Sequence, residues 1–220
     1  MEEHILCFKR EILRAHPNPA KTFYDESLWH EILAHLEPRP RSVAEHDYHY
    51  KQLVVYVLIN HDQTFLSYQR TPKTEEARLK AKYSIGIGGH VNVQDASQPS
   101  LFGAAGERWN DFLLEAVRRE VNEEVQIQGT ILQDPKLICF INDDSNDVGQ
   151  VHFGVVWLVR IADPNVTTRG ERGIGKLSFR NLAELSFMSE GLESWSQLLV
   201  EHLLRESSVW QEQQPQKGSR

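Results

Sequence analysis

The stretch Arg119-Glu120-Val121-Asn122-Glu123-Glu124 decides the fold expected of this chain. It closes a segment, starting near Glu107 or Asn110, whose apolar residues recur at helical spacing. At about 100° per residue, a stripe roughly 80° wide collects Leu114, Val117, Val121 and Val125. We expect this stripe of an α-helix to face the core of the protein.

The three glutamates of this stretch occupy an arc of about 100° beside the apolar stripe. Glu124 lies within about 20° of Val117 on the helical wheel, so we expect its carboxylate to point toward the protein. Carboxylates at positions i, i+3 and i+4 repel one another, whereas a hard divalent cation turns that repulsion into binding. Mg²⁺ is therefore the predicted ligand. Judged by this spacing alone, an acidic helix face exposed to solvent is a commoner explanation than a metal site.

Segments with the composition of β-strands precede and follow the helix. Leu53–Ile59 and Thr64–Tyr68 flank turn residues 60–63 and predict a hairpin, and a further strand is expected from Tyr83 to Gly89. Later strands are predicted at residues 136–141, 151–161 and about 176–179, and helices at about 26–36 and 190–205. The pattern predicts an α/β fold with a mixed sheet between helices.

The composition is that of a folded globular chain: of 220 residues, 40% are hydrophobic and 25% charged. We divide the chain into an N-terminal appendage at residues 1–45, a main domain at 46–206, and a disordered tail at 207–220. The main domain is predicted to end in the helix at about 190–205.

The charge balance favours a small-molecule partner over a nucleic-acid polymer. The chain has 31 acidic and 24 basic residues, a formal net charge of -7, whereas nucleic-acid binding requires clustered Lys and Arg. Cys7 and Cys139 are too few for a disulfide framework, so a reducing cytoplasm is expected. No signal peptide or membrane span is predicted. A homodimer is compatible with the sequence.

The acidic helix and its surroundings resemble the Nudix box, Gly-x5-Glu-x7-Arg-Glu-U-x-Glu-Glu-x-Gly-U, in which U is aliphatic. The match includes Gly88-Gly89 and the residues from Arg119 to Ile127, and the resemblance covers about residues 52–185. The phrase from Tyr83 to Asn92 also resembles a MutT-like branch of predicted phosphoesterases. The resemblance implies a Nudix-type α/β/α sandwich and Mg²⁺-dependent hydrolysis of a diphosphate bond in a small molecule, foremost a nucleoside diphosphate linked to another group.

The resemblance also implies a metal site. Glu120, Glu123 and Glu124 would bind one or more Mg²⁺ ions, for which Mn²⁺ could substitute. Gly88 would add its carbonyl oxygen. Oxygen ligands of this kind suit both ions.

Further roles follow from the same resemblance. Arg119 would orient a carboxylate, and either Glu120 or a loop carboxylate would act as the general base. The candidate for the loop carboxylate is Glu171, for which an ordinary surface residue is the alternative. Because His90 directly follows Gly88-Gly89, Gly89 and His90 are expected at the substrate, with His90 either as a hydrogen-bond donor to a phosphate or as a hydrogen-bonded structural residue.

Three departures from the family pattern affect these expectations. Gly89 and Arg119 are 30 positions apart where the family has 14, so about 16 residues are inserted, and the loop at residues 94–106 is expected beside the site. Counted back from Arg119, the family glutamate is replaced by Asp111, whose role is open. Gln126 replaces the glycine that ends the family's helix.

Two other functions compete with hydrolysis. A Nudix-like domain could bind or sense a nucleotide without cleaving it, but such a domain has less need of the complete glutamate triplet. An enzyme like isopentenyl-diphosphate isomerase would require a reactive cysteine, and Cys139 lies on a predicted strand without suitable neighbours.

Overall fold

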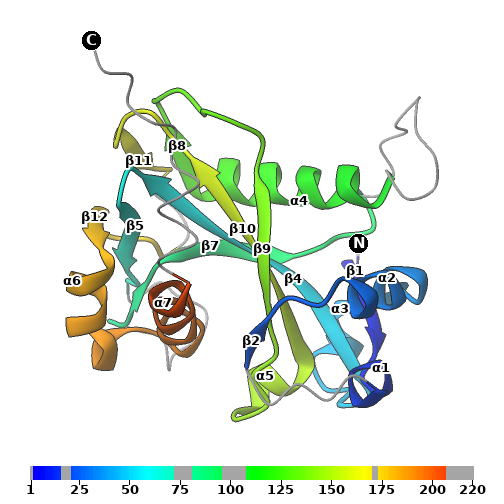
Figure 1. Cartoon of the computed structure of the whole chain (residues 1–220). Coiled ribbons are helices and arrows are strands. Elements are labelled where there is room, and N and C mark those ends of the chain that lie inside the picture. Colours follow the sequence, from blue (N-terminus) through cyan, green and yellow to red (C-terminus); the bar gives the residue numbers. More distant parts are fainter. Residues whose placement is uncertain (1, 16–20, 72–80, 96–107, 170–172, 207–220) are drawn as a thin grey trace.

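A computed structural model describes residues 2–15, 21–71, 81–95, 108–169 and 173–206 (Figure 1). Its centre is the long strand β4 (Tyr50–His61), of which all residues but the first and last are buried. β4 pairs in parallel with β10 (His152–Arg160) and antiparallel with β7 (Gly86–His90). Such a strand reads as a continuous apolar run because both faces of the sheet are covered.

The remaining strands extend this pairing into a ten-stranded mixed sheet with the main order β12-β5-β4-β10-β9-β2. The predicted hairpin is β4 with β5 (Thr64–Gln69), and the turn between them includes Asp62 in the left-handed conformation, φ 49°. The other members are β1 (His4–Lys9), β2 (Thr22–Phe23), β3 (Glu37–Pro40), β6 (Tyr83–Ser84), β9 (Lys136–Ile141) and β12 (Ser178–Asn181).

Helices cover the two faces of the sheet. α4 (Arg108–Glu124) and α2 (Glu26–Ala34) share a core with Val55 and Val57 of β4. α7 (Ser194–Arg205) packs against the alternate residues of β4 on the opposite face (Figure 1). This alternation confirms the predicted α/β/α sandwich, because successive side chains of a strand point to opposite faces.

The N-terminal segment completes the sheet. β1 pairs with β4 and with β3, and β2 pairs with β9. α1 (Glu11–Ala15) and α3 (Arg41–Ala44) connect these strands. Pro38 and Pro40 follow α2 and lie in a strand, which proline tolerates because β3 lies at an edge of the sheet. A separate appendage ending at residue 45 stays a prediction.

The C-terminal part differs from its prediction in one respect. The helix expected from about residue 190 begins at Ser194, after α6 (Leu182–Phe187) and a short 3₁₀ helix (Ser189–Gly191). Glu193 is held in an extended conformation, since its backbone N–H donates to Tyr83 and its carboxylate accepts hydrogen bonds from Tyr56 and Arg70. These contacts prevent the helix from starting earlier.

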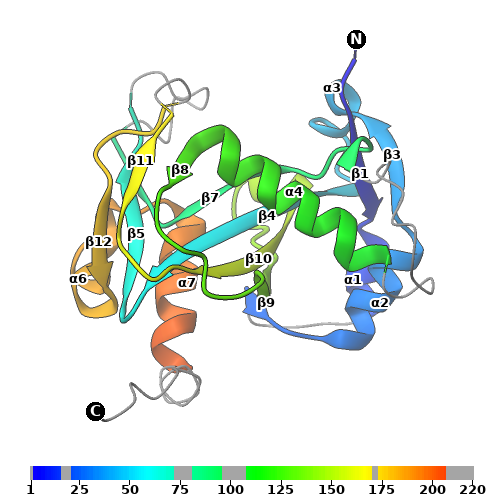
Figure 2. The same ribbon diagram turned by 90° about the horizontal axis from the view of Figure 1, so that it is seen from above.

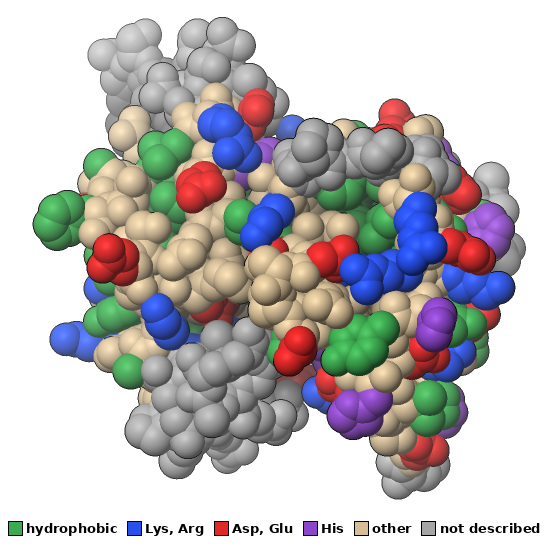
Figure 3. All heavy atoms as spheres, turned by 90° about the horizontal axis from the view of Figure 1, so that it is seen from below, with side chains coloured by type: hydrophobic (Ala, Val, Ile, Leu, Met, Phe, Trp, Pro, Cys, Tyr) green, Lys and Arg blue, Asp and Glu red, His purple; other side chains and the backbone are tan. Residues whose placement is uncertain are grey.

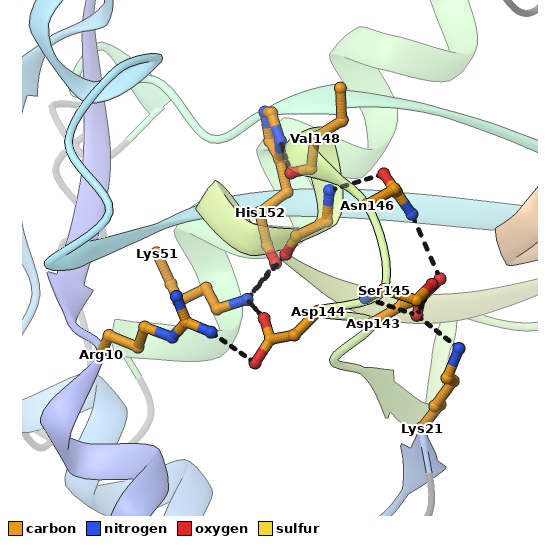
Figure 4. A network of polar contacts seen from close by, with 10 residues as sticks. Arg10, Lys21, Lys51, Asp143, Asp144, Ser145, Asn146, Val148 and His152 are labelled. Carbon is orange, nitrogen blue, oxygen red and sulfur yellow. Dashed lines mark hydrogen bonds and ion pairs between the residues drawn. The ribbon is translucent and has the colours of Figure 1, made fainter.

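A buried cation fixes the connection between β9 and β10, which includes α5 (Asp147–Val151). The fully buried Lys51 donates from Nζ to Asp144 Oδ1 at 2.6 Å and to the carbonyl of Gly149 at 2.7 Å (Figure 4). Burial lowers the pKa of Lys51, and the hydrogen bond to Asp144 opposes that shift. Arg10 also contacts Asp144, at 2.7 Å. The connection is therefore tied to β4 and to the N-terminal segment.

Asp143, next to this network, is a carboxylate whose stabilising effect depends on pH. Its Oδ1 accepts hydrogen bonds from Lys21 Nζ at 2.7 Å and Ser145 Oγ at 2.6 Å. Burial alone would raise the pKa of Asp143, but the hydrogen bonds from Lys21 and Ser145 outweigh it, so the pKa lies below its usual value. The stabilisation is thus present above the unfolded-state pKa and is lost as the pH falls through the folded-state pKa.

We predict that Asp143→Asn lowers the free energy of unfolding at neutral pH by about 1–2 kcal/mol, because the buried hydrogen bonds lose their charged acceptor. The difference from the wild type should shrink as the pH is lowered, since the wild-type carboxylate then becomes protonated. Urea unfolding across the acid range measures this, with the exposed Asp134→Asn as control. A difference that does not change with pH would contradict it.

The described surface carries both signs of charge. On the face shown in Figure 3, Lys and Arg side chains are interspersed with Asp and Glu. Of the helices within the described ranges, none has the length and apolar character needed to cross a membrane.

Candidate active site

α4 crosses the sheet over β7 and brings the acidic residues to a glycine (Figure 2). Gly89 pairs with Val55, whose side chain faces α4. A Cβ at position 89 would lie 2.6 Å from Cδ of Glu120, closer than van der Waals contact allows. Glycine is therefore needed here for the Glu120 carboxylate to approach the strand.

Arg119 holds this junction together. Its guanidinium donates to both carboxylate oxygens of Asp95 at 2.9 Å, to the carbonyl of His90 at 2.9 Å, and to Glu120 Oε1 at 2.6 Å. The hydrogen bond to Asp95 raises the pKa of Arg119, while burial opposes the shift and the charge of Glu120 adds to it. The guanidinium stays charged and fixes α4 against the end of β7.

The three predicted metal ligands differ in exposure. The Glu120 side chain is 8% exposed, and that of Glu123 is 33% exposed with Oε1 at 3.6 Å from Arg119 Nη1. Oε2 of Glu124 is buried. Across the described part of the chain, the one group of three His, Cys, Asp or Glu side chains with ligand atoms within 4.8 Å of one another lies elsewhere. The glutamates of α4 therefore form an open arrangement and not a closed cage.

Asp95, and not Asp111, is the further carboxylate that binds Arg119, and Asp111 is exposed in the first turn of α4. Asp95 is six positions after Gly89, the distance that the family pattern gives when it is counted forward from the glycine. Counting back from Arg119 misses it because the inserted residues lie between Asp95 and α4. The signal was thus present at the glycine end of the motif.

The other predicted site residues lie as follows. The backbone of His90 joins the site through its carbonyl, but His90 pairs with Val54, so its ring lies on the face away from α4. There its Nε2 is 3.0 Å from Nε2 of His152. Gly88 lies beside Gly89 in β7. Glu171 and residues 96–107, which include most of the predicted loop, lie outside the described residues.

The pKa of His90 lies well below its usual value, chiefly because of burial, and the neighbouring His152, Arg41 and Arg119 add to the shift. The ring is therefore neutral near neutral pH. A neutral imidazole is one hydrogen-bond donor and one acceptor.

The remaining departures have structural explanations. Gln126 lies in β8 (Val125–Ile127), which pairs with β11 (Val166–Thr168), so the chain leaves α4 directly into a strand and needs no left-handed glycine. Cys139 is fully buried, and burial raises its pKa to about 12. Such a thiol is a poor nucleophile, which speaks against isomerase-like chemistry.

Comparisons with known proteins agree with this architecture. No protein-family model matches the chain. Protein YmaB of Bacillus subtilis (strain 168) is 31% identical over 188 residues, which cover 82% of this chain and 86% of that protein. The crystal structure of Tm1382, a candidate Nudix hydrolase, superposes with a TM-score of 0.72 and 27% identity, over 92% of this chain and 99% of Tm1382. The chain belongs to the Nudix superfamily.

We predict that Asp95→Asn destabilises the protein by about 1–3 kcal/mol, because Arg119 loses a charged bidentate acceptor in a largely buried position. Asp111→Asn is the matched control and should change stability by less than about 0.5 kcal/mol, since Asp111 is exposed. Denaturant unfolding of both variants measures this. Equal effects at the two positions would show that the contact between Asp95 and Arg119 does not stabilise the junction.

Proposed function

We propose that this protein is a Mg²⁺-dependent hydrolase that cleaves a phosphoanhydride bond in a small molecule. The observation that carries the proposal is the junction of β7 and α4, where Glu120 and Glu123 both contact the guanidinium of Arg119 next to Gly89. Membership of the Nudix superfamily supports the same reaction class.

The donor set suits Mg²⁺. This ion retains several waters and binds through one or two carboxylates together with substrate phosphates, so it does not require a closed protein cage. Glu120 would anchor the ion from its buried position, and the more exposed Glu123 leaves an open side for substrate. Glu124 and the carbonyl of Gly88 are the further proposed ligands. When bound, Mg²⁺ or Mn²⁺ would neutralise diphosphate oxygens and make a coordinated water more acidic.

The residues of the chain would then have distinct tasks. Arg119 is a positioning residue, because it holds the carboxylate of Glu120 at 2.6 Å. Glu120 or Glu171 would accept a proton from the attacking water. The fixed hydrogen bond from Arg119 favours Glu120 as a ligand and leaves the base to Glu171, so Glu171→Gln should lower kcat more than it changes metal affinity.

We expect hydrolysis of at least one compound in a panel of nucleotide sugars, ADP-ribose, dinucleoside polyphosphates, deoxynucleoside triphosphates and small diphosphates. A nucleoside diphosphate linked to another group is the proposed substrate class. Activity should require Mg²⁺ or Mn²⁺. Glu120→Gln and Glu123→Gln should each lower kcat/KM by about 100-fold or more, because a catalytic metal contributes several kcal/mol to transition-state stabilisation.

The matched control is Glu115→Gln on the same helix, where the native side chain pairs with Arg118 at the surface, and it should leave activity unchanged within about twofold. Activity that persists within a few-fold in excess EDTA would contradict a metal-dependent reaction. Binding of a nucleotide without turnover on the whole panel would favour the sensing domain instead.

Metal binding is also expected to appear as a change in stability. Saturation with Mg²⁺ at about 100 times its Kd should stabilise the wild type by about 2.7 kcal/mol, since a ligand that binds only the folded state shifts the unfolding equilibrium. Glu123→Gln should be about as stable as the wild type without metal, because its ion pair with Arg119 is long and partly exposed, but should lose most of the Mg²⁺ gain. Thermal unfolding with and without Mg²⁺ measures both. A Gln variant that keeps the full gain would show that Glu123 is not a ligand.

A further inference from the structure

Three side chains of types that can bind a metal ion meet on the side of the sheet opposite α4. They are Glu45 at the end of α3, His90 at the end of β7, and His152 at the start of β10, and their nearest ligand atoms all lie within 4.8 Å of one another. The two Nε2 atoms are 3.0 Å apart. Residues from three separate elements thus converge on one point.

The orientation of His152 is set by its second nitrogen. Nδ1 lies 2.7 Å from the carbonyl of Val148, so it carries the hydrogen and donates it (Figure 4). The other ring nitrogen, Nε2, is the one that lies next to His90. Metal-binding histidines usually donate their other ring N–H to a carbonyl or carboxylate in this way.

The backbone around His152 is also fixed. The buried Lys51 donates to the carbonyls of Gly149 at 2.7 Å and His152 at 3.3 Å, and its charge is balanced by Asp144. This network, remote from α4, orders the turn that presents His152 before any ligand binds. A rigid supporting shell of this kind is what a metal site requires.

We propose that Glu45, His90 and His152 form a second metal site, which binds a first-row transition-metal dication such as Zn²⁺. Two imidazoles and one carboxylate are a donor set for Zn²⁺ and related ions, whereas Mg²⁺ prefers oxygen alone. Two nitrogens on a tetrahedral Zn²⁺ are about 3.3 Å apart, a small change from the present separation. Three protein ligands leave a fourth position for water or another ligand.

The alternative is a hydrogen bond between the two rings. It requires His90 to donate from Nε2, since His152 already carries its hydrogen on Nδ1. Glu45 would then keep only its salt bridge with Arg41, at 3.3 Å. The two arrangements can be distinguished experimentally, because only the metal site would bind a transition-metal ion.

The test uses the full-length protein, stripped with EDTA and returned to millimolar Mg²⁺, with Co²⁺ as the probe. Co²⁺ in an oxygen-rich six-coordinate site absorbs weakly in the visible range, while a four-coordinate site with nitrogen ligands absorbs strongly. We expect one equivalent of strongly absorbing Co²⁺ per chain, displaced by one equivalent of Zn²⁺. Absence of this equivalent in the wild type would leave the hydrogen-bonded pair as the correct description and overturn the proposal.

The variants assign the ligands. His90→Gln and His152→Gln should abolish the Co²⁺ spectrum, and Glu45→Gln should weaken Co²⁺ binding at least about tenfold, the loss that even outer-shell changes produce. The exposed His30→Gln is the matched control and should bind as the wild type does. A spectrum that survives in His152→Gln overturns the site. Far-UV circular dichroism in EDTA checks that each variant is folded. If a variant unfolds, the NMR spectrum of the Co²⁺-bound wild type replaces it: two shifted imidazole N–H signals would identify the histidines as ligands, and their absence would reject the site.

This site is independent of the proposed hydrolase site. Glu123→Gln should lose Mg²⁺-dependent hydrolysis yet retain the Co²⁺ equivalent, because Glu123 lies on α4, on the other face of the sheet. Loss of both properties in Glu123→Gln would contradict two separate sites.

Discussion

The register between β4 and β7 determines what each functional residue can reach. Gly89 pairs with Val55 and faces α4, while His90 pairs with Val54 and faces the opposite side. Because side chains alternate along a strand, a shift of one residue would exchange the two faces. The acidic helix would then lose the glycine that admits Glu120. Such a shift would be costly because β4 is buried on both faces along its length, and its alternate side chains pack into two different hydrophobic clusters.

Arg119 then explains how the junction tolerates a large insertion. The guanidinium binds the carbonyl of His90 and the carboxylate of Asp95, so the strand end is attached to α4 before the inserted residues begin. In the sequence, the inserted residues lie between this attachment and Arg108, where α4 begins. The entropic cost of closing a loop between fixed ends grows only with the logarithm of the loop length, so lengthening the loop adds little to that cost. The family geometry can therefore be retained although its sequence spacing is not.

The sequence was sufficient for features that depend on strong periodicity or on turn chemistry. The hairpin of β4 and β5, strand β9 and helix α4 lie close to where their patterns predict them. β8 and β11 were missed because three residues are too few for a periodic signal. α6 was missed although Asn181 and Glu184 form a capping box, a signal that the sequence does contain.

Only the part of the site that lies within a single helix could be predicted from the sequence. Glu123 lies three residues after Glu120 and four after Arg119 on a helical surface, so the spacing predicts that Glu123 is close to both. The partnership of Asp95 with Arg119 depends on how an insertion is counted. The cluster of Glu45, His90 and His152 could not be found in that way, because its members are far apart in the sequence and meet only through strand pairing.

Differences in donor chemistry allow the two proposed cation sites to coexist in one chain. The α4 site offers carboxylates beside a permanent positive charge, Arg119, which limits the net negative charge and favours an ion that brings its own water and substrate phosphates. The cluster of Glu45, His90 and His152 offers two imidazole nitrogens and one carboxylate. Imidazole nitrogens suit transition metals, whereas a hard ion such as Mg²⁺ prefers oxygen ligands. Mg²⁺ at cellular abundance would therefore fill the first site without competing for the second. The sheet between them, through the alternation of β7, keeps the two sets of donors from mixing.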